Sequence, residues 1–116
     1  AELIAQAVQV DDVIYLSGQV GVDEQGKAPD SLVAQTTLAY QHVKAVLAEF
    51  GATLDNVVEE TVFVTDISQT MAQVQEVFAA RAAAYGGRPD VAQTLVAVSA
   101  LVDQAFKIEI KCTAHL

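Results

Sequence analysis

Hydrophobic and polar residues alternate in the first twenty positions in a way that predicts two antiparallel strands. Residues 3–10 alternate loosely and end at Asp11-Asp12, and residues 13–20 are rich in strand-forming side chains. An Asp-Asp turn between two such runs is typical of a hairpin. Residues 21–30 contain glycine, proline and aspartate, which predicts a loop.

The middle of the chain changes to a helical spacing. Asp30 or Ser31 can cap the first turn of a helix, and Gly51 can end it because glycine tolerates the left-handed conformation. A second helix is predicted to start near Ser68 or Thr70, where Thr70 and Gln73 fit a capping box, and to end at Gly86, Gly87 and Pro89. The apolar positions at helical spacing are Leu32, Ala39, Val43, Val46, Leu47 and Phe50 in the first helix, and Met71, Val74, Phe78 and Tyr85 in the second.

Three further strands are predicted at residues 59–66, 94–101 and 105–113. The order ββαβαββ over a single domain, residues 1–116, predicts an α+β fold in which two helices cover one face of a mixed sheet. Alternation assigns to the helix-facing side Ile14, Leu16, Val62, Val64, Val96, Val98, Ile108 and Ile110. It assigns to the opposite side Tyr15, Ser17, Gln19, Thr61, Phe63, Thr65, Leu95, Ala97, Ser99, Lys107, Glu109 and Lys111. The second face mixes apolar and polar groups, which favours a subunit interface that also contains a pocket.

Composition narrows the class of protein. The 116 residues are 53% hydrophobic and include a single cysteine, Cys112, which alternation places on the helix-facing side as a buried structural thiol. Nothing resembles a signal peptide, and no apolar stretch reaches the roughly 18 residues that a membrane span needs. These features predict a cytoplasmic protein without membrane contact, with the mature form of an exported protein as the alternative.

The formal net charge is −9, and the six basic residues form no run and no basic helix face. Because nucleic-acid affinity comes mostly from Lys and Arg contacts to phosphate, we expect no nucleic-acid partner. Two histidines and one cysteine, widely spaced, predict no metal site, and no glycine-rich phosphate loop is present. The residues therefore predict neither a metal site nor a phosphate-binding loop.

Four motifs then occur in a specific order: Ser17-Gly18-Gln19 after an apolar strand, Gln35 in the first helix, residues 61–66 (Thr-Val-Phe-Val-Thr-Asp) and residues 107–110 (Lys-Ile-Glu-Ile). With them the chain resembles the Rid family of reactive intermediate deaminases, also called YjgF-like, from about residue 4 to residue 114. The resemblance implies a chorismate-mutase-like fold and a homotrimer with clefts between neighbouring subunits. It also implies a small-molecule ligand, and hydrolysis of reactive enamines and imines to an oxo compound and ammonia without a cofactor.

The resemblance further implies which residues line the pocket. Ser17 and Gly18 match the serine-bearing strand, and Glu109 matches the catalytic glutamate that positions or activates water. The position of the carboxylate-binding arginine holds Gln93, with Leu95 two residues later on the same strand face, and the position of a tyrosine holds Ile4. The chain begins close to Ile4, so the segment that usually precedes this position is expected to be absent or short.

The departure at Gln93 changes the expected substrate. A guanidinium fixes both the charge and the orientation of a carboxylate, and a neutral amide reproduces neither. A 2-imino acid should therefore bind poorly, which favours a substrate that is neutral or differently anchored and that Gln93 binds through its amide. The alternative is that Arg88, five residues earlier in the loop, reaches into the pocket.

Glu109 and Ser17 each have two interpretations. Alternation alone favours Glu109 as a solvated residue between Lys107 and Lys111, whereas the resemblance favours a general base in a partly apolar cleft, kept ionised by the two lysines. No histidine is placed to activate Ser17, so hydrogen bonding to a ligand or water is favoured over nucleophilic attack.

Three hypotheses about function follow. The first is a trimeric Rid-like hydrolase or deaminase that acts on an enamine, an imine or a related small carbonyl compound through Glu109. The second is a binding or regulatory trimer whose clefts hold a metabolite without turning it over, in keeping with the missing arginine and tyrosine. The third is ribonuclease activity or translation inhibition, which has been attached to the family and against which the acidic charge argues.

Overall fold

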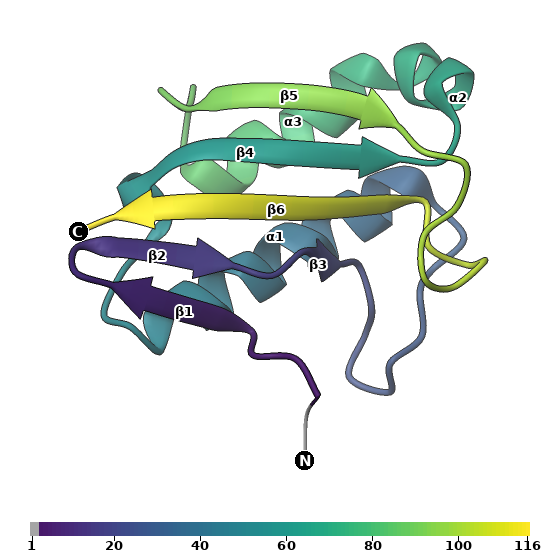
Figure 1. Cartoon of the computed structure of the whole chain (residues 1–116). Helices are drawn as coiled ribbons and strands as arrows, with labels where there is room; N and C mark the ends of the chain where they lie inside the picture. Colours follow the sequence, from purple (N-terminus) through teal and green to yellow (C-terminus); the bar gives the residue numbers. More distant parts are fainter. Residues whose placement is uncertain (1–2) are drawn as a thin grey trace.

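A twisted β-sheet with helices packed on one face makes up the computed structural model, which describes residues 3–116 (Figure 1). The strands are β1 (Ala7–Val10), β2 (Val13–Leu16), β3 (Gln19–Val20), β4 (Val57–Val64), β5 (Ala92–Ala97) and β6 (Ile108–His115). The helices are α1 (Leu32–Ala48), α2 (Ile67–Ala72) and α3 (Val74–Tyr85), with a short 3₁₀ turn, η1, at Leu54–Asn56.

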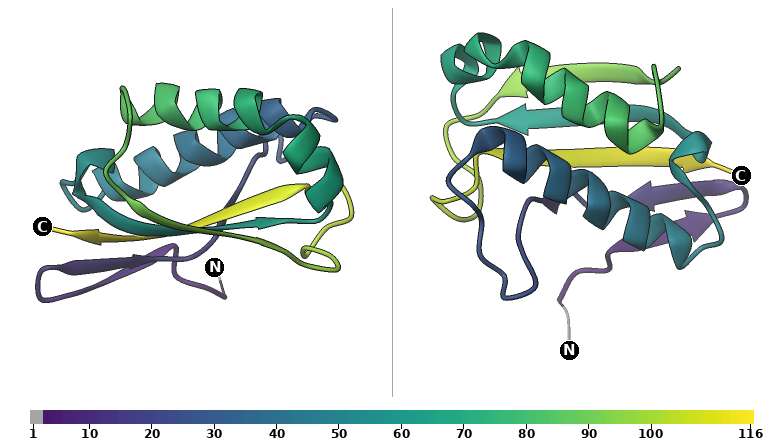
Figure 2. Two further views of the ribbon diagram at one scale, coloured as in Figure 1. Left: turned by 90° about the horizontal axis from the view of Figure 1, so that it is seen from above. Right: turned by 180° about the vertical axis from the view of Figure 1, so that it is seen from behind.

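The sheet has the strand order β1-β2-β6-β4-β5, and β3 also pairs with β6. Only β4 and β5 run parallel, because α2 and α3 connect them across the sheet, and the other pairs are antiparallel. The two views in Figure 2 show α1 and α3 side by side on one face, while no helix of residues 3–116 covers the other face. The predicted fold class, α+β with helices on one face of a mixed sheet, is confirmed.

The predicted N-terminal hairpin is present but its second strand is interrupted. Asp11 has φ 51°, and Val10 pairs with Val13 across the turn. Pairing with β1 stops after Leu16, where the Ser17 N–H donates to the carbonyl oxygen of Gln6 at 2.9 Å. The strand predicted over residues 13–20 is therefore two strands, β2 and β3, separated by Ser17-Gly18.

The first helix begins at the predicted residue and ends at Ala48, before the predicted stop at Gly51. The Ser31 hydroxyl accepts a hydrogen bond from the Ala34 N–H at 3.1 Å, which satisfies one free donor of the first turn of α1. Past its end, Gly51 has φ 73°, a conformation that glycine adopts without strain.

The second predicted helix differs from expectation. It starts earlier, because the Asp66 carboxylate accepts from the Gln69 N–H at 2.9 Å, and the proposed capping box of Thr70 and Gln73 is wrong. Thr70 lies inside α2 with its hydroxyl donating to the Asp66 carbonyl. The helix breaks at Gln73, so the single predicted helix is divided into α2 and α3.

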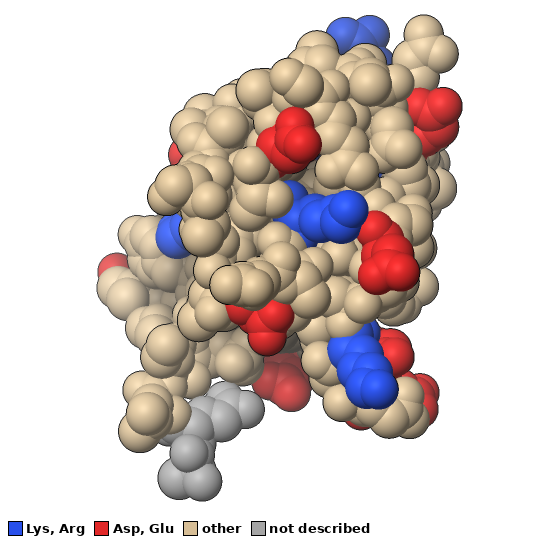
Figure 3. Space-filling view, turned by 90° about the vertical axis from the view of Figure 1, so that its right-hand side faces the viewer, with Lys and Arg blue, Asp and Glu red and all other residues tan. Residues whose placement is uncertain are grey.

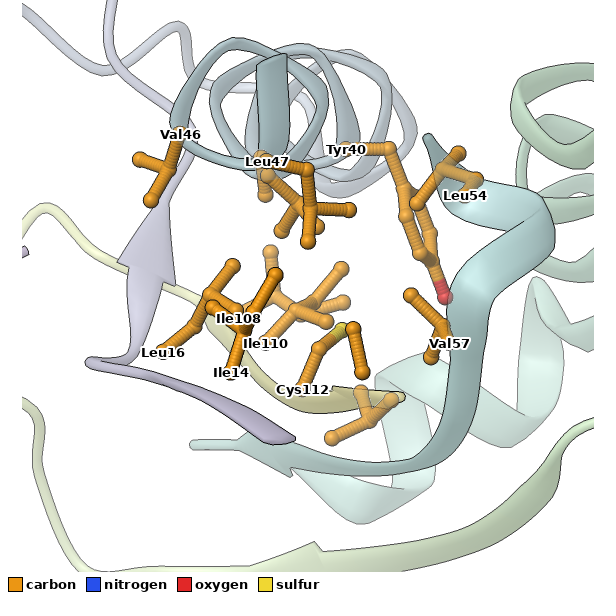
Figure 4. Packing of buried hydrophobic residues seen from close by; sticks show 14 of the residues in the cluster. Ile14, Leu16, Tyr40, Val46, Leu47, Leu54, Val57, Ile108, Ile110 and Cys112 are labelled. Atoms are coloured by element: carbon orange, nitrogen blue, oxygen red, sulfur yellow. The ribbon is translucent and has the colours of Figure 1, made fainter. Parts of the chain in front are cut away.

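The core lies between the sheet and the helices. Figure 4 shows Val46, Leu47 and Tyr40 of α1 above Ile108, Ile110 and Cys112 of β6. The predicted core positions on three strands, β2, β4 and β6, are buried, as is the predicted structural thiol: Ile14, Leu16, Val62, Val64, Ile108, Ile110 and Cys112. Hydrophobic burial of this set is the main stabilising contribution to the fold.

The predicted face assignment of β5 is wrong. Leu95 packs against the core, whereas Val96 is 37% exposed. The parallel register explains the difference, since Leu95 lies opposite the buried Val62, and Val96 lies opposite Phe63 on the uncovered face. Residues 94–101 are apolar at both parities, so alternation does not choose a face for this strand.

Among residues 3–116, the helices fall short of the length and apolar character that crossing a bilayer requires.

Candidate functional site

A hollow of about 520 Å³ opens on the uncovered face of the sheet. It lies where the segment before β1, the break between β2 and β3, and the strand β6 meet. Its walls combine apolar side chains with a carboxylate, an ammonium, an amide and a hydroxyl: Ile4, Gln6, Ser17, Gly18, Val20, Phe63, Val102, Glu109 and Lys111. A concave site with apolar walls and a few polar groups is typical of small-molecule binding.

Glu109 and Gly18 are in close contact at this hollow. A Cβ atom placed on Gly18 would overlap the Cγ, Cδ and Oε2 atoms of Glu109. The Glu109 side chain therefore lies across the backbone at Gly18, in space that any other residue would fill. Its strand neighbours at this point are Phe63 of β4 and Val20 of β3, so the carboxylate has apolar groups on both sides.

Ser17 is fixed by the segment that precedes β1. Its hydroxyl donates to the carbonyl oxygen of Ala5 at 2.7 Å, and its backbone N–H donates to that of Gln6. The two bonds hold Ala5 and Gln6 beside the hollow and place Ile4 on its rim. With its proton engaged, the hydroxyl oxygen keeps lone pairs that can accept a hydrogen bond from a ligand or a water.

The charged side chains of the β6 segment do not form ion pairs with one another in the described structure. Glu109 and Lys111 follow one another on the same face of β6, as predicted, and Lys107 lies one residue before the strand. Between residues 3 and 116, however, the one ion pair within 4.0 Å joins Arg81 to Glu60. Neither lysine therefore forms an ion pair with Glu109, and only Lys111 lines the hollow.

Gln35 fixes the start of β6. Its side chain is fully buried, donates from Nε2 to the carbonyl oxygens of Pro29 and Ala105, and accepts from the Lys107 N–H at 2.8 Å. The amide thus connects α1 to the loop that leads into β6, two residues before Glu109. This motif residue of the first helix supports the position of the carboxylate without lining the hollow.

The structure divides the predicted site residues into two groups. Ile4, Ser17, Gly18 and Glu109 line the hollow together. Gln93 and Leu95 do not, because β5 presents them to the helix-facing side, where Leu95 packs on the core. The β5 positions that share a face with Phe63 and Glu109 are Thr94 and Val96.

Gln93 instead joins a buried network around Glu60, which the sequence interpretation missed. The Glu60 side chain has no exposed surface and lies between β4 and the helices. Its Oε2 accepts from Tyr40 at 2.9 Å, from Arg81 Nε at 2.8 Å and from Gln93 Nε2 at 2.8 Å, and its Oε1 accepts from Tyr85 at 2.6 Å. The alternation of β4 could have revealed this network, because it puts Glu60 on the same buried side of the strand as Val62.

Burial and the Glu60 charge change the pKa values of the side chains in and beside this network. Burial and the adjacent Glu60 carboxylate raise the pKa of Tyr40 and of Tyr85 above the ordinary value for tyrosine. Burial acts to lower the pKa of Arg81, but the Glu60 charge outweighs it and raises that pKa. Burial, followed by the Glu60 charge, raises the pKa of Cys112 to about 12. All four groups thus keep their protons, and the network joins α1, α3, β4 and β5.

Arg88 is not among the residues that line the hollow. It lies in the loop before β5 and borders a separate depression, together with Tyr85, Pro89, Asp90 and Val91. The end of β5 nearest to Arg88, Ala92, pairs with Glu59 of β4. Glu59 lies four residues before Phe63, which is the β4 residue opposite Glu109. At about 3.3 Å per residue, that is a separation of roughly 13 Å along the strand.

Charged groups are scattered over the side of the molecule shown in Figure 3. On the face shown in Figure 3, the Lys and Arg side chains are separated from one another and acidic side chains lie between them. Within residues 3–116, no three His, Cys, Asp or Glu side chains gather in an arrangement that could hold a metal ion.

Comparison with known proteins shows to which protein family the chain is related. A sequence model of the family described as Endoribonuclease L-PSP matches residues 3–116. The chain belongs to this family. The resemblance to the Rid or YjgF-like proteins is thereby confirmed, since L-PSP, RutC and YjgF/Rid proteins recur among the relatives and the solved structures.

Relatives within the L-PSP family differ in how much of their length the chain matches. It is 32% identical to a RutC family protein of Pyrococcus abyssi over 113 residues, which cover 96% of this chain and 84% of that protein. It is 38% identical to the mouse 2-iminobutanoate/2-iminopropanoate deaminase over 66 residues, or 55% of this chain and 49% of that enzyme. The chain spans about half the length of several such curated relatives.

Solved structures of L-PSP family members have the same fold. RidA from the Antarctic bacterium Psychrobacter sp. superposes with a TM-score of 0.85 at 31% identity, covering 99% of this chain and 89% of that one. In this chain of the L-PSP family, the hollow brings together one carboxylate, one ammonium and apolar walls. Such a site can bind a small molecule and move a proton at Glu109.

Proposed function

We propose that the chain forms a homotrimer that hydrolyses a reactive enamine, imine or related small metabolite at clefts between its subunits, with Glu109 as the catalytic residue. One observation carries the proposal: the Glu109 carboxylate lies across Gly18 in an apolar-walled hollow on the face of the sheet that the helices leave uncovered. Membership of a family that includes an imine deaminase agrees with it.

The uncovered face supports the oligomeric part of the proposal. Val8, Tyr15 and Val96 are 52%, 48% and 37% exposed on this side, and Phe63 lies among them. A closed oligomer would bury these groups and extend the walls of the hollow. Association through this face would also remove water from the surroundings of Glu109.

The proposed chemistry needs one base and one water. Glu109 takes a proton from the water, whose oxygen forms a bond to the imine carbon while the C=N electron pair moves to nitrogen. Nitrogen gains protons, the carbinolamine collapses, and the C–N bond breaks to give the carbonyl compound and ammonia. An enamine enters the same path after protonation at carbon. Ser17 contributes an acceptor for the water or for the substrate N–H.

The substrate is proposed to differ from a standard 2-imino acid held by a guanidinium. Among the described residues of one subunit, no arginine lines the hollow. The Gln93 amide does not line it either, because it donates a hydrogen bond to Glu60. The hydrogen bond from Gln93 to the substrate, expected from the sequence, is therefore not part of this proposal.

The test uses purified protein with an amino acid oxidase that generates imines, and measures ammonia release. Glu109→Gln should lower the rate by about 10²–10⁴-fold, the usual contribution of a general base. Glu59→Gln, the same exchange on the uncovered face of β4 outside the hollow, is the matched control and should leave the rate unchanged. Equal rates for wild type and Glu109→Gln on every substrate tested would refute the catalytic role.

The trimer is tested by light scattering. The wild-type protein should have a mass three times 12.3 kDa. Tyr15→Glu should dissociate it because a charge on the interface loses its hydration, whereas Gln41→Glu on the exposed side of α1 should not. A monomeric wild type at working concentration would contradict the proposal.

A non-catalytic binding or regulatory trimer is the second candidate, and the absence of a guanidinium from the described walls of the hollow favours it. In that case small metabolites should raise the melting temperature while every imine stays unhydrolysed.

A further inference from the structure

The hollow contains a cation that the proposed function does not use. Lys111 is the sole lysine or arginine among its described lining residues, since Lys107 and Arg88 lie outside it. Its position on β6 is two residues from Glu109 on the same face, a distance of roughly 7 Å between the two backbone positions. The two charges therefore border one small volume.

The ammonium of Lys111 has no carboxylate partner in the described chain. Its nearest acidic neighbour along the strand, Glu109, turns across Gly18, and ion pairing in residues 3–116 is confined to Arg81 and Glu60. Across the sheet Lys111 lies opposite Thr61, which is uncharged. A lysine amine with three free donor directions is thus available to a ligand.

The surroundings of the amine favour an organic anion over a free mineral ion. Ile4, Val20, Phe63 and Val102 supply the apolar part of the lining, and these groups can cover a short hydrocarbon chain. A carboxylate on Lys111 gains a charge-assisted hydrogen bond, and its hydrocarbon part gains contact with these side chains. A neutral amide of the same shape keeps the contact with the apolar side chains but loses the charge-assisted hydrogen bond.

We infer that Lys111 determines the ligand specificity of the hollow by binding the carboxylate of a small organic acid whose apolar end lies against these walls. The inference rests on the proposed function and names the anchor of its substrate. It assigns the role of anion holder to a residue of β6, and it explains how the site can select an anion without a guanidinium. Because lysine is a point charge, the anchor fixes the position of the carboxylate but not its plane.

The experiment compares butanoate with its neutral isostere butanamide by calorimetric titration. Wild type should bind butanoate at least about tenfold more tightly than butanamide, which is the value of one charge-assisted hydrogen bond. Lys111→Met should lose that preference and Lys111→Arg should keep it. Lys107→Met, at a lysine just before β6 that lies outside the hollow, should behave as wild type. Lys111 is exposed, so these variants should melt at the wild-type temperature.

Equal binding of the two probes to wild type, unchanged butanoate affinity in Lys111→Met, or no binding of butanoate at all would each overturn the anchor. Ammonia release by Glu109→Gln is measured on the same preparations. Loss of turnover in Glu109→Gln together with a Lys111→Met protein that binds butanoate normally would overturn the anchor and leave the proposed function intact. Lys111-dependent binding with undiminished turnover in Glu109→Gln would support the anchor and contradict the proposed catalytic role.

Discussion

At the scale of single residues, the contact between Gly18 and Glu109 decides where the carboxylate lies. The carboxylate occupies the space that a side chain at position 18 would take, so the absence of a Cβ is a geometric requirement of this site. The backbone of Gly18 is not in the left-handed region, and another residue could adopt it without backbone strain. The requirement for glycine here therefore belongs to the hollow and not to the turn.

Gly18→Ala should displace Glu109 by the width of a methyl group. Misplacement of a catalytic group by about 1 Å can cost roughly 10²-fold in rate, so we expect a loss of that order in kcat/KM for imine hydrolysis. The melting temperature should change little, because the Glu109 side chain is partly exposed and can turn toward solvent. Undiminished kcat/KM in Gly18→Ala would show that Glu109 does not act from this position.

Glu60 is the residue on which the buried polar network depends. Glu60→Gln leaves the Arg81 guanidinium, which is 13% exposed, without its carboxylate. Removing one partner of a buried ion pair typically costs about 3–5 kcal/mol, and we expect a loss of that size in the free energy of unfolding in urea. Glu59→Gln, the exposed neighbour in sequence, should change it by no more than about 0.5 kcal/mol. Similar effects of the two substitutions would mean that the network contributes little.

At the scale of elements, the sequence was informative wherever one face of an element was polar. The hairpin at Asp11-Asp12, the cap at Ser31 and the alternation of β6 have local signals, and each was found at the predicted place. The second helix was misplaced because the true cap, Asp66, ended the predicted strand and was not read as a helix start.

β5 shows why half of the candidate site could not be predicted. Leu95, Val96 and Ala97 of this strand are apolar at both parities, and a side chain as polar as Gln93 is expected to face outward. Gln93 faces inward because its amide donates a hydrogen bond to Glu60, 33 residues away in sequence. A contact between residues so far apart leaves no local sequence pattern. The site residues after β2 and on β6 were predicted from the resemblance to the Rid family, and the clear buried face of these two strands puts Ser17 and Glu109 on the opposite side.

The face of β5 can be tested by placing an arginine at two successive positions. Gln93→Arg would put a second guanidinium beside Arg81 in the buried network, and should lower the free energy of unfolding by more than about 3 kcal/mol. Thr94→Arg places the same charge on the uncovered face and should be tolerated by the fold. A stable Gln93→Arg protein that gains activity on 2-imino acids, beside an inactive Thr94→Arg, would reverse this assignment.

At the scale of the whole molecule, one face of the sheet is closed by helices and a polar network, and the other face contains the hollow. The network ties α1 and α3 to the sheet through a charge, which makes the closed face sensitive to pH. The groups that respond are the ones whose protons the folded state retains: Cys112, Tyr40 and Tyr85.

Stability should therefore fall in alkaline solution. The folded Cys112 thiol keeps its proton to about pH 12, whereas the unfolded thiol, with its ordinary pKa of 9.0, loses it earlier. Between these values the folded state binds more protons than the unfolded state, so the free energy of unfolding decreases as pH rises, by up to about 1.4 kcal/mol per pH unit for one group. Below pH 9 this contribution is fully present.

Cys112→Ala isolates the thiol. The variant loses packing at every pH, so the quantity to compare is the slope of the free energy of unfolding against pH, measured with urea at fixed protein concentration. Between about pH 9 and pH 12 the slope of the variant should be shallower than that of wild type, and the two tyrosines should account for the fall that remains. Parallel curves across this range would show that the thiol titrates alike in both states, which its burial beside Glu60 does not permit.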